Sequence, residues 1–508
     1  MRTRLLYPDA DLDVEALPEP DPDLVADLEL ERLFTAMAAG DTRVLEVARS
    51  VVPLGAAPAA APPDPAAVRY RQAVVADALA SPATVRALYR LAGDALDGER
   101  RVWGGTLRSA ELVLRRSVEV ADGLLEAVRG IRDVLARDRA SLSSAGLAGL
   151  ADRLAADLDD AFLAEARAAL RQLDDRTLIA TAGLGPGNRA ADFVLRRAPG
   201  ARSRLRDRVG LERQRGLAVD VALHDQNAMN ALAELRAQAV AAAAGTVAES
   251  AGHLLAFCRH LRDEAAFLVG CINLDDALAR RGLARCRPDL ASPGEAGLRA
   301  EGLADPCLAL AIDGPVTGSG VDTSRRPLAV VTGANGGGKS TLLRAVGVAH
   351  LMAAAGMPTA AVSLQAGLPN GVLVHFPRAE SGADAEGRLD GELRRLRDLV
   401  ARARPGSLLL LNEPLSSVNE RDGSAIAGEL VRGLLAGGAQ VWLVTHHHEL
   451  AAGLHAAPPA PALFLRAARG EGAERPFLLT EAPPLETAFG ADLWDAEVGS
   501  PAGADAAG

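Results

Sequence analysis

The stretch Leu328-Ala-Val-Val-Thr-Gly-Ala-Asn-Gly-Gly-Gly-Lys-Ser-Thr341 decides how this chain folds. Its apolar start, Leu328 to Thr332, has the composition of a buried strand, and a helix-forming run from Leu342 to Ala355 follows the glycines. The order strand, Gly-x-x-x-x-Gly-Lys-Ser, helix is the one that a phosphate-binding loop requires, because glycines let the backbone wrap an anion while N–H groups point at it. The sequence therefore predicts a nucleotide site formed by Gly333, Ala334, Asn335, Gly336, Gly337, Gly338, Lys339, Ser340 and Thr341.

Lys339 stands out because the composition has almost excluded lysine. Lysine and arginine together number 55, and Lys339 is the single lysine. A compact ammonium and a guanidinium fork are not interchangeable against phosphate. We therefore expect Lys339 to neutralise the β- and γ-phosphates of ATP and Ser340 to ligate Mg²⁺, whereas an ordinary glycine-rich turn would need no lysine here.

A second apolar run, Ser407 to Leu411, ends in Asn412-Glu413-Pro414. In a strand of this kind the first polar residue helps to hold Mg²⁺, and the carboxylate after it orients the attacking water. Glu413 is therefore the candidate catalytic base and Asn412 a candidate metal ligand. Asn412 stands where an aspartate is usual, and a neutral amide helps the metal less. The other interpretation of Glu413 is a solvated acid at a strand end.

A third apolar run, Val441 to Val444, ends in Thr445-His446-His447-His448. A histidine at such a strand end can sense the γ-phosphate through its hydrogen bonds, and we assign this catalytic role to His446. Three consecutive histidines also suggest a metal site, but adjacent residues rarely converge on one ion.

The chain changes character near residue 290. From Val68 to about Cys286 it is almost continuously helix-forming, with breaks near Ser141–Gly146, Gly183–Asn188 and Ala198–Gly200. After Asp289, apolar runs alternate with helical stretches, which predicts a largely parallel sheet with crossover helices. The predicted fold class is an α-helical core and lever region followed by an α/β P-loop NTPase domain of the ABC type. The predicted domains are 1–105 (N-terminal segment and first part of the core), 106–215 (lever arm), 216–289 (second part of the core), 290–498 (ATPase domain) and 499–508 (disordered tail).

Hydropathy, cysteine spacing and net charge limit which partners and compartments we expect for the chain. No run approaches the roughly 20 uninterrupted apolar residues of a membrane span, and the first residues lack a signal-peptide core, so we expect a soluble cytoplasmic protein without a membrane partner. The four cysteines form no Cys-x-x-Cys pair, which favours buried thiols in a reducing compartment. A net charge of −11 argues against a globally basic nucleic-acid binder.

A local arginine cluster over residues 196–215 is the best candidate for DNA contact, because its arginines outnumber its acids. A solvated helical face paired with nearby acids is the competing interpretation. The candidate DNA contacts are Arg202, Arg204, Arg206 and Arg208.

Taken together, these motifs resemble the ATPase domain of the MutS family. The segment 332–341 resembles the family's Thr-Gly-Pro-Asn-x-Gly-Gly-Lys-Ser-Thr, 412–423 resembles its Asp-Glu and D-loop, and 445–450 resembles its Thr-His-x-x-Glu-Leu. Tyr70-Arg71-Gln72 is similar to the start of the family's helical core. The resemblance implies a DNA-associated ATPase of the repair or recombination type, in which ATP binding and hydrolysis drive rearrangement of a homodimer and its helical arms.

The resemblance also implies a signature segment that reaches the partner's nucleotide, and Gly387-Arg388 occupies its place without the family's hydroxyl. Arg388 either meets the γ-phosphate in trans or is a solvated arginine at a helix start. None of the nine phenylalanines has Glu two residues later, so the chain is similar to the shorter group without a mismatch-reading domain.

Three other functions compete with this one. An ABC transporter subunit would carry Leu-Ser-Gly-Gly, and a chromosome-organising ATPase would carry long heptads and an N-terminal P-loop; the sequence has neither pattern. An ATP-binding scaffold with little hydrolysis is the serious rival, because Asn412 predicts weak turnover.

Overall fold

Two units divide the chain, one helical and one that contains the sheets. The computed structural model describes residues 1–56, 63–102, 110–174, 179–184, 190–196, 226–291, 297–334, 336–378, 388–467 and 477–484. The first unit comprises 1–5 and 83–265, and the second comprises 6–82 and 266–508. A helical region followed by an α/β region is thus confirmed, whereas the predicted domain limits stay predictions.

Long helices form most of the first unit: α5 (Pro82–Arg101), α6 (Ala110–Asp138), α7 (Leu147–Asp157) and α8 (Asp160–Asp174). The apolar stripe of α6, which includes Leu124, Val128 and Ile131, is buried. The predicted break near Ser141–Gly146 lies between α6 and α7. Arg132 closes a turn in this unit, because its guanidinium donates to the Leu158 carbonyl at 2.7 Å and to Asp160 at 2.8 Å.

A hairpin interrupts the region that the composition predicts as continuous helix. Strand β1 (Ile179–Leu184) pairs antiparallel with β2 (Ala190–Arg196). The sequence predicted a break at Gly183–Asn188 but helix on either side of it. The helix prediction is wrong at 179–184 and 190–196, where Ile, Thr, Phe and Val favour strands. Helix α10 (Gln226–Arg280) returns the chain to helix and continues into the second unit.

Helix α10 contains the one segment among the described residues, Val240–Arg280, that is long and apolar enough to cross a membrane by length and composition. A single helix of this kind is weak evidence, because core helices of soluble proteins meet the same criterion. Its residues 265–268 are fully buried. The absence of a membrane partner stays a prediction.

Short capped helices open the second unit. They are α1 (Pro22–Asp27), α2 (Leu30–Ala38), α3 (Thr42–Val51) and α4 (Pro65–Ala80). Side chains of Asp21, Asp41 and Asp64 accept backbone N–H groups at the starts of α1, α3 and α4. The Asp41 cap begins α3 and so separates it from α2.

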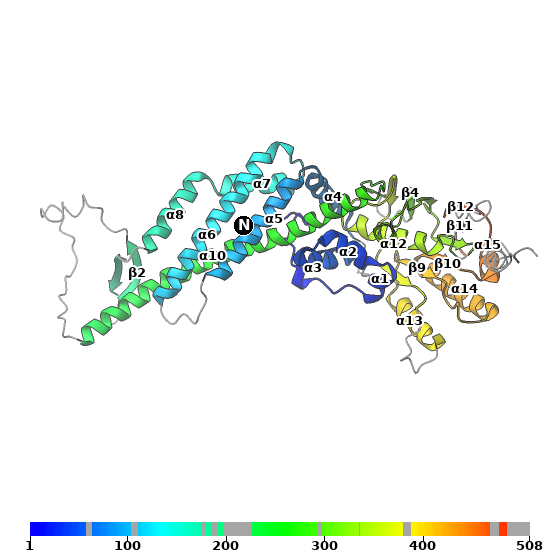
Figure 1. Ribbon diagram of the computed structural model, residues 1–508. Coiled ribbons are helices and arrows are strands. Elements are labelled where there is room, and N and C mark those ends of the chain that lie inside the picture. The colour runs from blue at the N-terminus through cyan, green and yellow to red at the C-terminus, as the bar shows by residue number, and fades with distance from the viewer. Residues whose placement is uncertain are drawn as a thin grey trace, which may run out of the picture. The chain divides into compact units, whose positions relative to one another are not determined.

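A six-stranded sheet dominates the second unit, in the order β12-β11-β6-β10-β9-β8 (Figure 1). Its members are β6 (Leu328–Thr332), β8 (Val372–His375), β9 (Leu408–Asn412), β10 (Gln440–Val444), β11 (Ala462–Ala467) and β12 (Leu479–Glu481). All neighbouring pairs are parallel except β11 with β12. The predicted strands at 328, 408 and 441, and their parallel arrangement, are confirmed.

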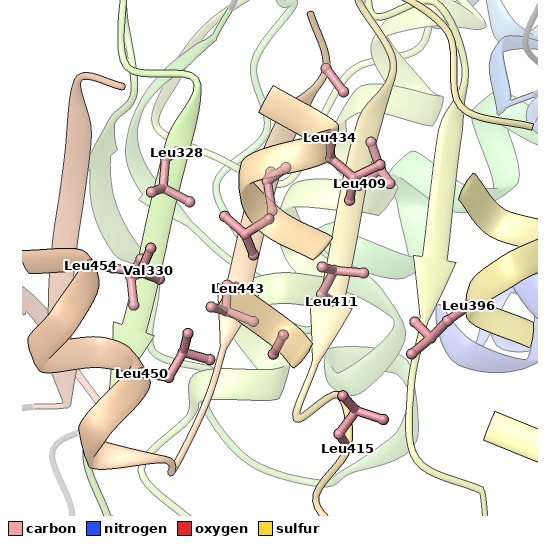
Figure 2. Packing of buried hydrophobic residues seen from close by; sticks show 14 of the residues in the cluster. Leu328, Val330, Leu396, Leu409, Leu411, Leu415, Leu434, Leu443, Leu450 and Leu454 are labelled. Atoms are coloured by element: carbon pink, nitrogen blue, oxygen red, sulfur yellow. The ribbon is translucent and has the colours of Figure 1, made fainter. Parts of the chain in front are cut away.

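Helices cover both faces of this sheet. On one face, alternate residues of the strands pack against α13 (Arg388–Arg402), α14 (Glu420–Ala436) and α15 (His448–Ala456). Figure 2 shows members of this cluster on both layers: Val330, Leu411 and Leu443 on the strands, and Leu434, Leu450 and Leu454 on the covering helices. On the other face lies α12 (Lys339–Ala354), where a Cβ on Gly347 would meet Leu410 at 2.7 Å. Burial on both faces requires the uninterrupted apolar runs that the sequence displays.

A smaller sheet, which the sequence did not predict, has the order β3-β7-β4-β5. It contains β3 (Asp289–Leu290), β4 (Leu298–Leu303), β5 (Ser319–Asp322) and β7 (Ser363–Ala366), with α11 (Pro306–Ala311) between β4 and β5. Asp305 caps α11 by accepting the N–H groups of Cys307 and Leu308. These strands are short and lack an apolar run, which is why the sequence pattern did not reveal them.

Candidate nucleotide site

Three parallel strands end at one edge of the large sheet and deliver the three motifs there. β10 lies between β6 and β9, so the glycine loop, Thr445 and Glu413 follow neighbouring strand ends. In open α/β sheets, ligands bind outside the carboxyl ends of the strands. The topology therefore brings together residues that are more than 100 positions apart in the chain.

The glycine loop closes tightly against the end of β11. A Cβ on Gly337 would lie 2.7 Å from the Cβ of Ala467, and one on Gly333 would lie 3.0 Å from it. Gly338, directly before α12, has φ of 87°, a left-handed value that disfavours side chains. These positions explain why the loop is built from glycine.

Lys339 directs its ammonium group back into the loop. Its Nζ donates to the carbonyl oxygens of Gly333 at 2.7 Å and Ala334 at 3.1 Å. Burial lowers the pKa of Lys339, and the charge of nearby Glu413 opposes that shift. The side chain therefore lies at the mouth of the loop, beside the N-terminus of α12, where an anion is favoured.

Ser340 and Asn412 meet although they come from different strand ends. The Ser340 hydroxyl donates to Oδ1 of Asn412 at 2.9 Å. Hydroxyl and amide oxygens suit Mg²⁺, which commonly takes only one or two protein ligands beside phosphate oxygens. Within the described ranges, no cluster of three or more His, Cys, Asp or Glu residues could hold a metal ion. The Ser340 and Asn412 oxygens are of the type that Mg²⁺ takes when phosphate supplies its other ligands.

Glu413 and His446 lie beside each other at this edge. The nearest carboxylate oxygen of Glu413 is 3.6 Å from Nδ1 of His446. Glu413 adopts φ of 49°, and its N–H donates to the Val444 carbonyl at 2.8 Å. His446 stacks on His447 with ring centroids 4.7 Å apart. His447 is buried, and burial together with the His446 charge lowers the pKa of His447.

A cavity of about 520 Å³ lies over the loop, and sequence reasoning missed half of its lining. Its polar part includes Lys339, Ser340 and Glu413. Its apolar part comes from two other segments, 303–316 and 477–479. The apolar lining residues are Leu303, Leu308, Ile312, Pro315, Val316, Phe477 and Leu479. No motif marks these residues. Leu303 ends β4, Leu308 lies on α11, and the other residues of the first segment follow α11. Phe477 and Leu479 lie just before and at the start of β12.

Several predicted site residues are not placed. Asn335, Gly387 and the four arginines Arg202, Arg204, Arg206 and Arg208 lie outside the described residues. Arg388 is described only as the first residue of α13. Gly336 and Thr341 line the cavity as predicted.

Comparisons with known proteins identify two family domains. Residues 63–281 match the model of the MutS2 N-terminal domain, and residues 329–473 match MutS domain V. The second match includes every strand end described above.

Curated relatives match shorter segments. An endonuclease MutS2 from Anaeromyxobacter sp. (strain Fw109-5) is 34% identical over 139 residues, which are 26% of this chain and 16% of that protein. A DNA mismatch repair protein MutS 2 from Halobacterium salinarum is 32% identical over 201 residues, 39% of this chain and 23% of that protein. The mitochondrial DNA mismatch repair protein MSH1 of Arabidopsis thaliana is 31% identical over 121 residues, 24% of this chain and 11% of that protein. The matched segments thus span less than a quarter of each relative.

Proposed function

Because this chain belongs to the MutS family, we propose that it is a DNA-associated ATPase whose second unit is a P-loop domain of the ABC type. The observation that carries the ATPase proposal is the hydrogen bond between Ser340 and Asn412 beside the ammonium group of Lys339. It joins the glycine loop to the strand that supplies Glu413.

Each side chain then has a defined task. Lys339 and the N-terminus of α12 neutralise the β- and γ-phosphates. Ser340 and Asn412 would hold Mg²⁺, which would supply positive charge against the phosphates. Glu413 accepts a proton from the water that attacks the γ-phosphorus, while the bond to the ADP oxygen breaks and inorganic phosphate leaves. His446 contacts the Glu413 carboxylate and reports the state of the γ-phosphate.

The apolar half of the cavity fits a purine base. Leu308, Ile312 and Phe477 line the same space as Lys339. A base there would contact apolar side chains, which commonly line cofactor sites. We propose that the adenine base of ATP binds in this part of the cavity.

Binding and single-turnover hydrolysis of Mg-ATP test the proposal on the full chain. We expect Lys339→Ala to weaken ATP binding by at least about tenfold, as loss of one charge-assisted contact implies. Glu413→Ala should retain binding and lose hydrolysis. Intact retention of Mg-ATP by Lys339→Ala would refute the proposal.

The rival function is an ATP-binding scaffold, and Asn412 favours it because an amide assists the metal less than a carboxylate. The same measurements separate the two. A wild-type hydrolysis rate indistinguishable from that of Glu413→Ala would establish the scaffold, whereas a clear difference would establish an ATPase.

The DNA part of the proposal draws on the relatives, two of whose names refer to DNA mismatch repair. Replacing Arg202, Arg204, Arg206 and Arg208 together by Ala should weaken duplex or branched DNA binding and reduce its salt dependence. Unchanged affinity at several salt concentrations would reject this cluster as the contact.

The homodimer is proposed on the same family basis, with Gly387-Arg388 reaching the partner's nucleotide. Light scattering of Glu413→Ala, which should trap ATP, tests it. We expect a dimeric mass with Mg-ATP, and Arg388→Ala should diminish that dimer if the segment acts in trans.

A further inference from the structure

Glu392, on α13, is a buried carboxylate that the proposed chemistry does not use. It is 7% exposed and does not line the nucleotide cavity. One of its oxygens lies 3.2 Å from Nε2 of buried His375, at the end of β8, and accepts the N–H of Leu415 at 2.7 Å. Its other oxygen lies 3.3 Å from the Ser417 hydroxyl. Both carboxylate oxygens are therefore engaged, and two of the three partners lie in the segment that follows Glu413.

That segment has an unfavourable backbone. Glu413 has φ of 49° and Leu415 has φ of 61°, and neither is glycine. A left-handed backbone conformation is unfavourable for a residue that carries a side chain. Such a turn persists only when its surroundings hold it in place.

The carbonyl oxygens of the two strained residues accept the N–H groups of Ser416 at 3.3 Å and Val418 at 3.0 Å, and their own N–H groups also donate. The N–H of Glu413 donates to the Val444 carbonyl at 2.8 Å, and the N–H of Leu415 donates to Glu392 at 2.7 Å. The first bond belongs to the sheet, but the second reaches a side chain on another element. Glu392 is thus the side-chain anchor of the turn that aims the Glu413 carboxylate.

We propose that Glu392 is a positioning residue for hydrolysis, which holds the turn 413–417 so that Glu413 faces the γ-phosphate side of the cavity. The proposal rests on the proposed ATPase function. It assigns no role in ATP binding to Glu392, because the residue touches neither the glycine loop nor the cavity.

The charge of Glu392 supports this role. Burial opposes its ionisation, yet the hydrogen bonds with His375, Leu415 and Ser417 outweigh burial and hold its pKa below the usual value. A carboxylate accepts at both oxygens, whereas a glutamine side chain accepts at one and donates at the other. Gln can still accept from Leu415 and donate to Ser417, so Glu392→Gln is the conservative variant and Glu392→Ala removes the anchor.

The test compares Mg-ATP affinity with single-turnover hydrolysis in the full chain. For Glu392→Ala we expect hydrolysis slower by about 10²-fold, the size that a misplacement of roughly 1 Å produces, with the ATP Kd changed by less than about threefold. Glu392→Gln should recover most of the rate. Asp398→Ala, at an exposed site on the same helix, is the matched control and should leave both quantities unchanged.

A double mutant separates positioning from general damage. In the Glu413→Ala background, Glu392→Ala should cause no further loss of hydrolysis, because the group it positions is gone. An additional loss, an unchanged rate in Glu392→Ala alone, or a parallel loss of ATP binding would each overturn the inference.

Failure of the proposed function gives a different result. If the wild-type chain binds no Mg-ATP, or binds it without hydrolysis, the hydrogen-exchange rate of the Leu415 amide tests whether Glu392 holds the turn. Exchange should accelerate by at least about tenfold in Glu392→Ala and not in Asp398→Ala, since the amide loses its acceptor. Equal exchange in the two variants would overturn the proposal.

Discussion

The hydroxyl of Ser340 donates a 2.9 Å hydrogen bond to the side-chain oxygen of Asn412, across 72 residues of sequence. This contact connects the helix that begins at the glycine loop with the end of β9. An amide oxygen carries only a partial charge, so the contact is weaker electrostatically than one to a carboxylate. The identity of residue 412 should therefore control how well the site holds Mg²⁺.

Asn412→Asp should lower the Mg²⁺ concentration needed for half-maximal ATP hydrolysis and raise the turnover rate. We expect about tenfold in each, since charge-assisted contacts exceed neutral ones by about 1–1.5 kcal/mol. A Mg²⁺ titration of steady-state phosphate release measures both. Gln365→Glu, which makes the same amide-to-carboxylate change at an exposed site on β7, is the matched control and should change neither. Identical titrations for Asn412→Asp and wild type would show that this residue lies outside the metal's influence.

Gly337→Ala should weaken Mg-ATP binding by at least about tenfold. The new Cβ would lie 2.7 Å from the Cβ of Ala467 and 3.0 Å from the Ala334 carbonyl, so the loop must move at a cost of about 1–3 kcal/mol. Equilibrium binding of a fluorescent ATP analogue measures the loss.

Two further variants identify the contact responsible for that loss. Adding Ala467→Gly to Gly337→Ala should restore part of the affinity, because it removes the closer of the two clashes. Gly453→Ala, on α15 with no atom within 4 Å of the added Cβ, should leave affinity unchanged. A loop that tolerates Gly337→Ala would contradict the packing described for it.

The sequence predicted the large sheet and the polar half of the site for one physical reason. Strands buried on both faces must be continuous apolar runs, and phosphate chemistry restricts which residues can follow them. The apolar runs that end at Thr332, Asn412 and Val444 therefore predicted three strands and the polar residues that follow each strand. Their convergence at one edge follows from parallel pairing.

The rest depends on tertiary contacts that leave no local pattern. Phe477 and Ile312 line the cavity from distant segments, and nothing in their neighbours distinguishes them from ordinary apolar residues. In the sequence, Glu392 is one of many charged residues on an amphipathic helix. Its burial is evident only in the structure, where α13 packs beside the turn at Leu415. The hairpin at 179–196 was missed because the surrounding helical composition outweighed its glycines.

Arg71→Ala should destabilise the second unit by about 2–3 kcal/mol. The Arg71 guanidinium donates to the Ala354 carbonyl at the end of α12, at 2.8 Å, and lies 5.2 Å from the centre of the Tyr7 ring. A hydrogen bond from a charged group and a cation–π contact both disappear in the variant. Thermal unfolding measures the change, and Arg69→Ala, at an exposed site on α4, should shift it by less than about 0.5 kcal/mol.

Asp27 gives the second unit a pH dependence opposite to that of most carboxyl groups. Burial raises its pKa to about 6, although the Arg395 charge and a hydrogen bond with the Phe376 backbone act against that shift. The folded state therefore binds the proton more tightly than the unfolded state. Its contribution to stability is greatest below pH 4 and declines as pH rises toward 6, after which it stays constant.

Asp27→Asn should consequently raise the thermal midpoint at pH 7.5 and have little effect at pH 4. An amide resembles the protonated acid but cannot ionise, so it avoids the cost of a buried charge. We expect about 1 kcal/mol at pH 7.5, discounted for solvent screening at this half-buried site. Glu429→Gln, at an exposed carboxylate on α14, provides the control at both pH values. A variant that is less stable than wild type at pH 7.5 would show that attraction to Arg395 and the hydrogen bond with the Phe376 backbone together outweigh burial.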